Sequence, residues 1–246
     1  ENSRLTINKW VEDKTREKIK NLISPGAIDP MTALVLVNAV YFKGDWAGQF
    51  DKTRTVDGEF SAASGEKQKA RFMRQKRFFK YRELEGLQIL EMPYSGDRLA
   101  MTIILPQDTK SLSSIEKALT AEKLNDWLKY MRQVEVDVSV PKFTIEWGTT
   151  DITGSLQKLG IKNAFSGKAD FTGMVDGGGV KIDMVLHKTF IEVNEEGSEA
   201  AGATAVIMRK TAMIRTPEFR ADRPFIFMIR DTSSGAILFL GRVSEL

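Results

Sequence analysis

The sequence predicts a mixed α+β fold in a single domain, because short strand-like runs dominate it and only a few helical segments interleave with them. Neither an internal repeat nor a low-complexity linker divides the 246 residues. With 42% hydrophobic and 28% charged residues, the chain has the ordinary composition of a globular protein that buries a sizeable core.

The N-terminal part has helical periodicity. Ile7, Trp10 and Val11 fall on one face with charges between them, and the pattern ends at the breaker Ser-Pro-Gly at 24–26. This pattern predicts an amphipathic helix followed by a shorter one. Two further helices are expected over 114–132 and over 150–159.

Strand-like runs account for most of the remaining chain. Residues 33–42 are β-branched and almost wholly apolar, which is typical of a strand covered on both faces, and only Asn38 interrupts the run. The other predicted strands span 78–81, 87–92, 99–105, 134–140, 185–193, 225–229 and 236–241. Sheet is therefore expected to dominate the domain.

Charge and residue content exclude several classes of protein. The net charge of +3 and pI near 8.9 fall short of the clustered excess of a nucleic-acid-binding protein. Because cysteine is absent, no disulfide framework or thiolate metal site is expected. No apolar run approaches the roughly 20 residues of a bilayer-spanning helix, so no membrane partner is expected. Residues 1–4 are no basic lead-in to a signal peptide.

An enzyme is not expected. His187 is the only histidine, so a hydrolytic triad would depend on it entirely, and no Gly-x-Ser-x-Gly elbow is present. We interpret His187 as a structural core residue. The glycine run 177–179 lacks the following pattern and the lysine of a phosphate loop, so it is interpreted as a turn and no nucleotide is implied.

The segment 195–217 has no plausible core role. It connects strand-like 189–193 with 225–229, and a connection this long inside a compact domain is usually functional or disordered. Alternate positions in it form one set that contains Glu199 and Arg209 and another set that carries no charge. The uncharged set is Ser198, Ala200, Gly202, Thr204, Val206 and Met208. Such a segment can insert into a sheet as a strand with one buried face.

Several motifs resemble those of the serpin family. Residues 195–205, Glu-Glu-Gly-Ser-Glu-Ala-Ala-Gly-Ala-Thr-Ala, resemble the hinge of its inhibitory members, and 219–227 resemble the signature that follows the reactive loop. Further motifs agree in the family's order at 36–46, 140–143, 159–161, 187–188 and 235–242. The resemblance covers essentially the whole chain, so it implies one serpin domain over 1–246 with a reactive-centre loop at about 195–217. It also implies a large central, mainly antiparallel β-sheet with smaller sheets, surrounding helices and an exposed loop.

The resemblance begins within the family's sixth helix, so the first third of a normal serpin is expected to be missing. That third includes the helix that often binds glycosaminoglycans and the helix that lines the opening of the main sheet. The chain is therefore expected to need an N-terminal serpin fragment to complete its fold. Extracellular action is the family's commoner habit, so secretion is the expected localisation.

The resemblance implies an irreversible suicide-substrate inhibitor of serine proteases. The protease attacks the loop and forms an acyl-enzyme, cleavage frees the hinge, and the loop inserts into the main β-sheet as an additional strand. The tethered protease is distorted, and because a misplacement of about 1 Å can cost roughly 100-fold in rate, the acyl bond persists. The matching hinge residues are Glu195, Gly197, Ser198, Glu199, Ala200, Ala201, Gly202 and Ala203.

The usual loop length, counted from Gly197, places the scissile bond between Thr211 and Ala212. Threonine before the bond suits serine proteases with small, elastase-like pockets. Arg209 and Lys210 lie just upstream and suit a trypsin-like pocket, so the bond between Lys210 and Thr211 is the second choice.

Residues outside the loop also acquire roles from the resemblance. Asn38 and His187 match the two polar residues of the shutter at the centre of the sheet, where a buried pair must be satisfied and each substitution should cost on the order of 1 to 3 kcal/mol. Trp46, Lys142 and Glu195 match the breach, where the loop first enters the sheet. Lys142 with Glu195 resembles the family's salt bridge at that point.

Two alternatives to the simple inhibitor stay open. A non-inhibitory serpin, acting as carrier, chaperone or storage protein, typically has bulky, charged or proline residues in the hinge, whereas this hinge is small. A glycosaminoglycan-regulated serpin is suggested by basic residues interleaved with aromatics, which bind polyanions by counterion release and stacking. The competing interpretation is a solvated strand face, which needs no cofactor. The candidate residues for a heparin-like glycan are Lys67, Lys69, Arg71, Arg74, Lys76, Arg77 and Lys80.

Overall fold

The computed structural model describes residues 1–84, 86–109, 111–196 and 216–246. It contains two compact units, which the chain enters more than once. Unit 1 comprises Glu1–Phe42 and Thr144–Glu192, and unit 2 comprises Lys43–Phe143 and Val193–Leu246. The single serpin domain over 1–246 stays a prediction, because these units are defined by compactness alone.

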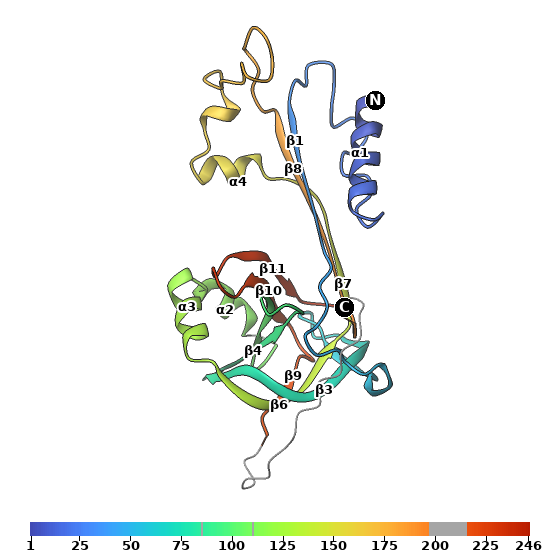
Figure 1. The fold of residues 1–246 in the computed structure, drawn as a ribbon, viewed down its shortest axis with the longest axis vertical. Coiled ribbons are helices and arrows are strands. Elements are labelled where there is room, and N and C mark those ends of the chain that lie inside the picture. Colours follow the sequence, from blue (N-terminus) through green and yellow to red (C-terminus); the bar gives the residue numbers. More distant parts are fainter. Residues whose placement is uncertain (85, 110, 197–215) are drawn as a thin grey trace. The chain divides into compact units, whose positions relative to one another are not determined.

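Unit 1 is built on a three-stranded sheet with the order β1-β8-β7. Strand β1 runs parallel to β8, with Val35 opposite Met184 and Phe42 opposite Ile191 (Figure 1). The elements of this unit are α1 (Asn2–Lys14), β1 (Val35–Phe42), β7 (Phe143–Asp151), α4 (Thr153–Lys158), the 3-10 turn η2 (Asn163–Phe165) and β8 (Met184–Val193).

Helix α1 and the segment after it cover one face of this sheet. Val11, Ile19 and Leu22 form a buried cluster against which Val37, Ala39, Tyr41 and Phe190 pack. The buried stripe of α1 contains Arg4, Asn8 and Val11, whereas Trp10 is 55% exposed, so placing Trp10 on the packed face was wrong.

The shorter helix expected after α1 is also absent from the described residues. Arg16, Glu17 and Asn21 have positive φ angles, which break helical geometry. The Asn8 amide holds this segment against α1 instead, because it donates to Ile23 O at 2.9 Å and accepts from Ile23 N at 2.8 Å.

The prediction that 33–42 forms a strand was correct, but the prediction that both its faces are covered was wrong. No residue of β1 is fully buried, Leu36 is 43% exposed and Asn38 is exposed. Alternate residues of a strand point to opposite faces. Val37, Ala39 and Tyr41 pack toward α1, and the described part of the chain leaves the other face open.

Unit 2 is built on an eight-stranded, mainly antiparallel sheet with the order β11-β10-β5-β4-β3-β6-β9, and β2 pairs with β3 beside this path. Only β6 and β9 pair in parallel among its described strands. The elements are η1 (Lys52–Arg54), β2 (Val56–Ser61), β3 (Lys67–Leu84), β4 (Leu87–Pro93), β5 (Leu99–Pro106), α2 (Leu112–Ala118), α3 (Ala121–Lys129), β6 (Arg132–Pro141), β9 (Glu218–Arg220), β10 (Phe225–Asp231) and β11 (Ile237–Val243).

Helices α2 and α3 cover one face of the large sheet (Figure 1). Their buried side chains meet β4, β5 and β10 in one cluster, whose members are Leu87, Ile89, Ile104, Leu112, Ile115, Leu124, Trp127, Ile226 and Met228. The single helix expected over 114–132 is wrong. Leu119 is extended, and Thr120 begins a new helix by accepting a hydrogen bond from Lys123 N at 3.1 Å.

Most of the predicted strands are present with small shifts in their ends. The run 78–81 is the last part of the 18-residue strand β3, and 150–159 divides between the end of β7 and the short helix α4. Within the described ranges, no helix has the length and apolar character needed to cross a membrane.

Candidate functional site

Asn194, Glu195 and Glu196, which precede the segment 197–215, are held by contacts within unit 2, and we call these three residues the upstream anchor. Lys142 Nζ lies 2.7 Å from Glu195 Oε2, and Thr55 Oγ1 donates to Glu195 Oε1 at 2.8 Å. Phe50 N donates to the backbone oxygen of Glu195 at 3.0 Å. The Glu195 side chain is only 5% exposed, so these partners hold it in a buried position.

Glu195 keeps its charge although it is buried. Burial alone would raise the pKa of this carboxyl, but the hydrogen bonds from Lys142 and Thr55 outweigh burial and hold the pKa below that of an ordinary glutamate. The anchor is therefore an ion pair at neutral pH.

Trp46 clamps the backbone of the same anchor. Its indole Nε1 donates to Asn194 O at 2.9 Å, and its backbone N donates to Glu196 O at 3.4 Å. The indole stacks on Tyr94 with ring centroids 4.5 Å apart and meets Phe50 edge-on at 6.2 Å. The three residues expected at the breach, Trp46, Lys142 and Glu195, thus lie together in unit 2, and their role in loop entry stays a prediction.

Sequence reasoning missed three partners of the anchor: Phe50, Thr55 and Lys52, whose ammonium pairs with Glu196. They lie about 140 positions away along the chain, and no local spacing rule links residues that far apart.

The downstream end of the segment is held by strand pairing. Asp137 N donates to Pro217 O at 2.9 Å, and β9 then pairs with β6 in parallel from Glu218 to Arg220. Phe219 is completely buried. The described residues that flank 197–215 on both sides are therefore held within the same compact unit.

The predicted hinge and scissile bond lie outside the described residues, apart from Glu195. The residues concerned are Gly197, Ser198, Glu199, Ala200, Ala201, Gly202, Ala203, Lys210, Thr211 and Ala212. Their roles stay predictions.

Asn38 and His187, expected in the shutter, are direct neighbours in the parallel pairing of β1 with β8. Asn38 is exposed and His187 is half-buried, and the described part of the chain gives neither side chain a hydrogen-bond partner. The two residues are adjacent, but neither is buried in the described part of the chain, so the burial expected of this pair is not observed. Their role as the shutter stays a prediction.

The basic residues considered for glycan binding all lie on β3. Several pair with carboxylates of unit 2: Lys67 with Glu59 at 2.8 Å, Arg71 with Asp57 at 3.9 Å, Lys76 with Glu135 at 3.2 Å and Lys80 with Glu91 at 2.9 Å. Among the aromatics of the strand, Phe72, Phe79 and Tyr81 are buried. The alternative interpretation, a solvated strand face with its aromatic side chains packed inward, fits most of β3. Lys69, Arg74 and Arg77 have no ion pair within the described residues.

Comparison with known proteins decides the family. The family model described as "Serpin (serine protease inhibitor)" matches residues 1–246. The chain belongs to the serpin family. The resemblance inferred from the motifs is thus confirmed over the whole length.

Curated serpins match all of this chain. The human leukocyte elastase inhibitor is 44% identical over 254 residues, and the chain covers 67% of that protein. Serpin B6 of Pongo abelii is 45% identical and 66% covered, and human Serpin B3 is 43% identical and 64% covered. The chain therefore spans about two thirds of the length of these serpins.

Solved serpin structures confirm the fold. Uncleaved ovalbumin matches with a TM-score of 0.86 at 31% identity, over all of this chain and 63% of that one. Human thyroxine-binding globulin, solved in complex with thyroxine, matches with a TM-score of 0.82 at 32% identity, over 98% of this chain and 64% of that one. The α+β serpin fold expected from the sequence is correct.

Proposed function

We propose that this chain is the larger part of an irreversible, suicide-substrate inhibitor of serine proteases. The observation that carries the proposal is continuity: β8 runs through the upstream anchor directly into 197–215, and its neighbour β1 is parallel to it. A segment that follows β8 and folds back along it is antiparallel to β8, and therefore also to β1.

Insertion between β1 and β8 replaces one parallel pairing by two antiparallel ones. Antiparallel pairing is slightly more stable per residue, and each added pairing satisfies backbone groups. The uncharged alternate positions from Ser198 to Met208 give the inserted strand a face that can be buried. The upstream anchor is the point from which the inserted strand starts, so the ion pair of Lys142 with Glu195 holds the boundary between the fixed and the moving parts.

The relatives favour an inhibitor whose target has an elastase-like pocket. One of them is named leukocyte elastase inhibitor, and the small Thr211 at the expected scissile bond fits such a pocket. Thyroxine-binding globulin shares the fold and is named for a hormone that it binds, so the fold alone does not separate inhibitors from carriers. The small hinge residues favour an inhibitor, because an inserting strand cannot bury bulky or charged side chains on its inward face.

In this mechanism no residue of the chain performs catalysis. The target protease supplies the nucleophile, and Thr211 supplies the acyl group that becomes trapped. Completion by an N-terminal serpin fragment stays part of the proposal. Secretion stays a prediction that the relatives do not support.

The proposal is tested by incubating the full-length protein with trypsin-like, chymotrypsin-like and elastase-like proteases, followed by denaturing gels and sequencing of the released C-terminal peptide. We expect a complex that survives boiling and a new N-terminus at Ala212. Cleavage without any complex would make the protein a substrate-like, non-inhibitory serpin.

Two hinge variants separate insertion from cleavage. Ser198→Arg places a charge in the uncharged alternate set and should convert the inhibitor into a substrate that is cleaved at an unchanged rate. Glu199→Arg changes a residue of the other set and should still form the complex. Equal loss of complex in both variants would contradict insertion with Ser198 facing inward.

A further inference from the structure

Unit 2 contains a cavity of about 250 Å³ that the proposed inhibitory mechanism does not use. Its walls come from the chain after β1, from β3 and β4, from the turn after β4 and from the start of β6. The lining residues are Trp46, Ala47, Gly48, Gln75, Arg77, Phe78, Phe79, Met92, Pro93, Asp97 and Gln133.

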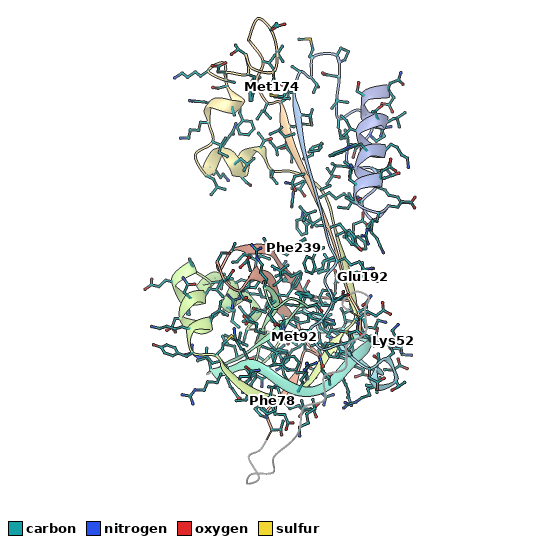
Figure 2. All side chains as sticks on the ribbon, viewed as in Figure 1. Lys52, Phe78, Met92, Met174, Glu192 and Phe239 are labelled. Carbon is teal, nitrogen blue, oxygen red and sulfur yellow. The ribbon has the colours of Figure 1, made fainter. Side chains whose placement is uncertain are left out.

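The body of the cavity is aromatic and apolar. Trp46, Phe79 and Met92 are at most 4% exposed, so their side chains form a fixed wall. Phe78 is 47% exposed, and Figure 2 places it toward the edge of the unit, whereas Met92 lies within the unit. Rings and a methionine sulfur in this arrangement favour an aromatic guest.

A buried amide without a partner faces this space. Gln75 is only 8% exposed, and its side chain has no hydrogen bond within the described residues. Among the described residues, the side-chain atoms that are both fully buried and unpartnered are Asp45 Oδ1 and Arg74 Nε. The Gln75 amide is not among them, so it still reaches accessible space. Because Gln75 lines the cavity, its amide can hydrogen-bond to a ligand there.

Two opposite charges complete the lining. The Arg77 guanidinium lies directly against Gly48, so an added Cβ at position 48 would overlap it and the guanidinium would have to move. Asp97 lies on the turn after β4. Neither charge forms an ion pair with any described residue, although most other cations of β3 do.

We propose that this cavity binds a small aromatic α-amino acid as a zwitterion. The carboxylate pairs with Arg77, the ammonium group pairs with Asp97, the ring lies against the aromatic wall, and Gln75 supplies a further hydrogen bond. A volume equal to about eight waters suits a ligand smaller than a typical drug. A ligand of this size binds with a Kd on the order of 1 mM or somewhat below.

The test is isothermal titration calorimetry of the full-length protein with L-phenylalanine, 3-phenylpropionate and phenethylamine. Only L-phenylalanine carries both charges, so it should bind at least about tenfold more tightly than either analogue. Failure of L-phenylalanine to bind at millimolar concentration would overturn the proposal. So would equal binding of 3-phenylpropionate, because Asp97 would then contribute nothing.

Variants test the role of the Arg77 cation, and Lys76 on the same strand provides the control. Arg77→Gln, and Gly48→Ala, which displaces the guanidinium without removing it, should each weaken L-phenylalanine at least about tenfold. Lys76→Gln removes a cation that does not line the cavity and should leave the affinity unchanged. Equal affinities for Arg77→Gln and the parent protein would overturn the site, and the ligand comparison on the parent protein decides if a variant fails to fold.

Discussion

Strands β1 and β5 are similar in sequence but differ completely in burial. Val35–Phe42 and Leu99–Pro106 are both nearly continuous apolar runs, yet no residue of β1 is fully buried, whereas all of β5 except Leu99 is. The difference lies in the layers around them. In unit 2, helices α2 and α3 pack on the part of the sheet that contains β5, whereas in unit 1 α1 and the segment after it pack on one face of β1 and leave Leu36 and Asn38 exposed.

An apolar strand therefore predicts that its faces need to be covered, but the covering elements come from other parts of the fold. The chain spans about two thirds of its relatives. We therefore expect an N-terminal serpin fragment to cover the open face of β1, and we expect unit 2 to hold most of the stability that this chain has by itself.

The largest expected effect contrasts the cores of the two units. Phe219→Ala removes a completely buried ring from unit 2 and should lower the free energy of unfolding by about 3 to 5 kcal/mol. Leu36→Ala removes a side chain that is 43% exposed in unit 1 and should cost about 0.5 kcal/mol. Urea unfolding followed by circular dichroism measures both values. A large cost of Leu36→Ala in this chain would contradict the exposure of that face, whereas a cost that appears only after the N-terminal fragment is added would show that the fragment covers it.

The next effect compares one ion pair in each unit. Glu91 in unit 2 is 3% exposed and contacts Lys80 and Arg230, so Glu91→Gln leaves a largely buried Arg230 without its counter-charge and should cost about 3 kcal/mol. Glu146 in unit 1 is 51% exposed where it meets Lys188. Lys188 is itself largely buried, with 10% of its side chain exposed, but its Nζ still donates to Lys20 O at 2.8 Å after Glu146→Gln, so this change should cost at most about 1 kcal/mol. Equal costs in the same unfolding experiment would contradict the difference in burial between the two glutamates.

The upstream anchor should give a smaller effect that depends on pH. The pKa of Glu195 is held below its ordinary value of 4.5, so its ion pair stabilises the folded state fully above that value, and this contribution is lost as pH falls through the lowered folded pKa. Glu195→Gln should cost about 1 to 3 kcal/mol at pH 7 and progressively less toward pH 3. Unfolding measured across pH 3 to 7 tests this sign. Glu196→Gln, which changes an acid that is 41% exposed, is the matched control and should show little of the trend.

Local patterns and linear motifs in the sequence predicted the fold correctly. The predictions of burial failed where residues far away along the chain determine whether a strand is covered. Alternation and turn signals located β4, β5, β6, β8, β10 and β11, because each strand is encoded by its own residues. The break at Thr120 had a local signal that was missed, because threonine is a preferred N-cap and Glu122 lies in the first turn of α3. The exposure of Asn38 depends on which elements cover β1, and no strand pattern encodes that. Trp46, Lys142 and Glu195 came from family motifs, whereas Thr55 and Lys52 had no signal in the sequence.

The smallest expected effect is on heparin binding, and it compares the paired and the unpaired cations of β3. Most of the proposed glycan-binding cations already contact carboxylates, so a polyanion has to compete with Glu59, Asp57, Glu135 and Glu91. Binding by counterion release would make retention on a heparin column fall steeply with salt. We expect weak retention that is lost below physiological ionic strength.

Lys69→Gln, which removes a cation without an ion pair among the described residues, should reduce retention more than Lys67→Gln. Retention that survives physiological salt and drops equally in both variants would show that the carboxylates do not neutralise this strand. That result would favour the glycan-regulated alternative.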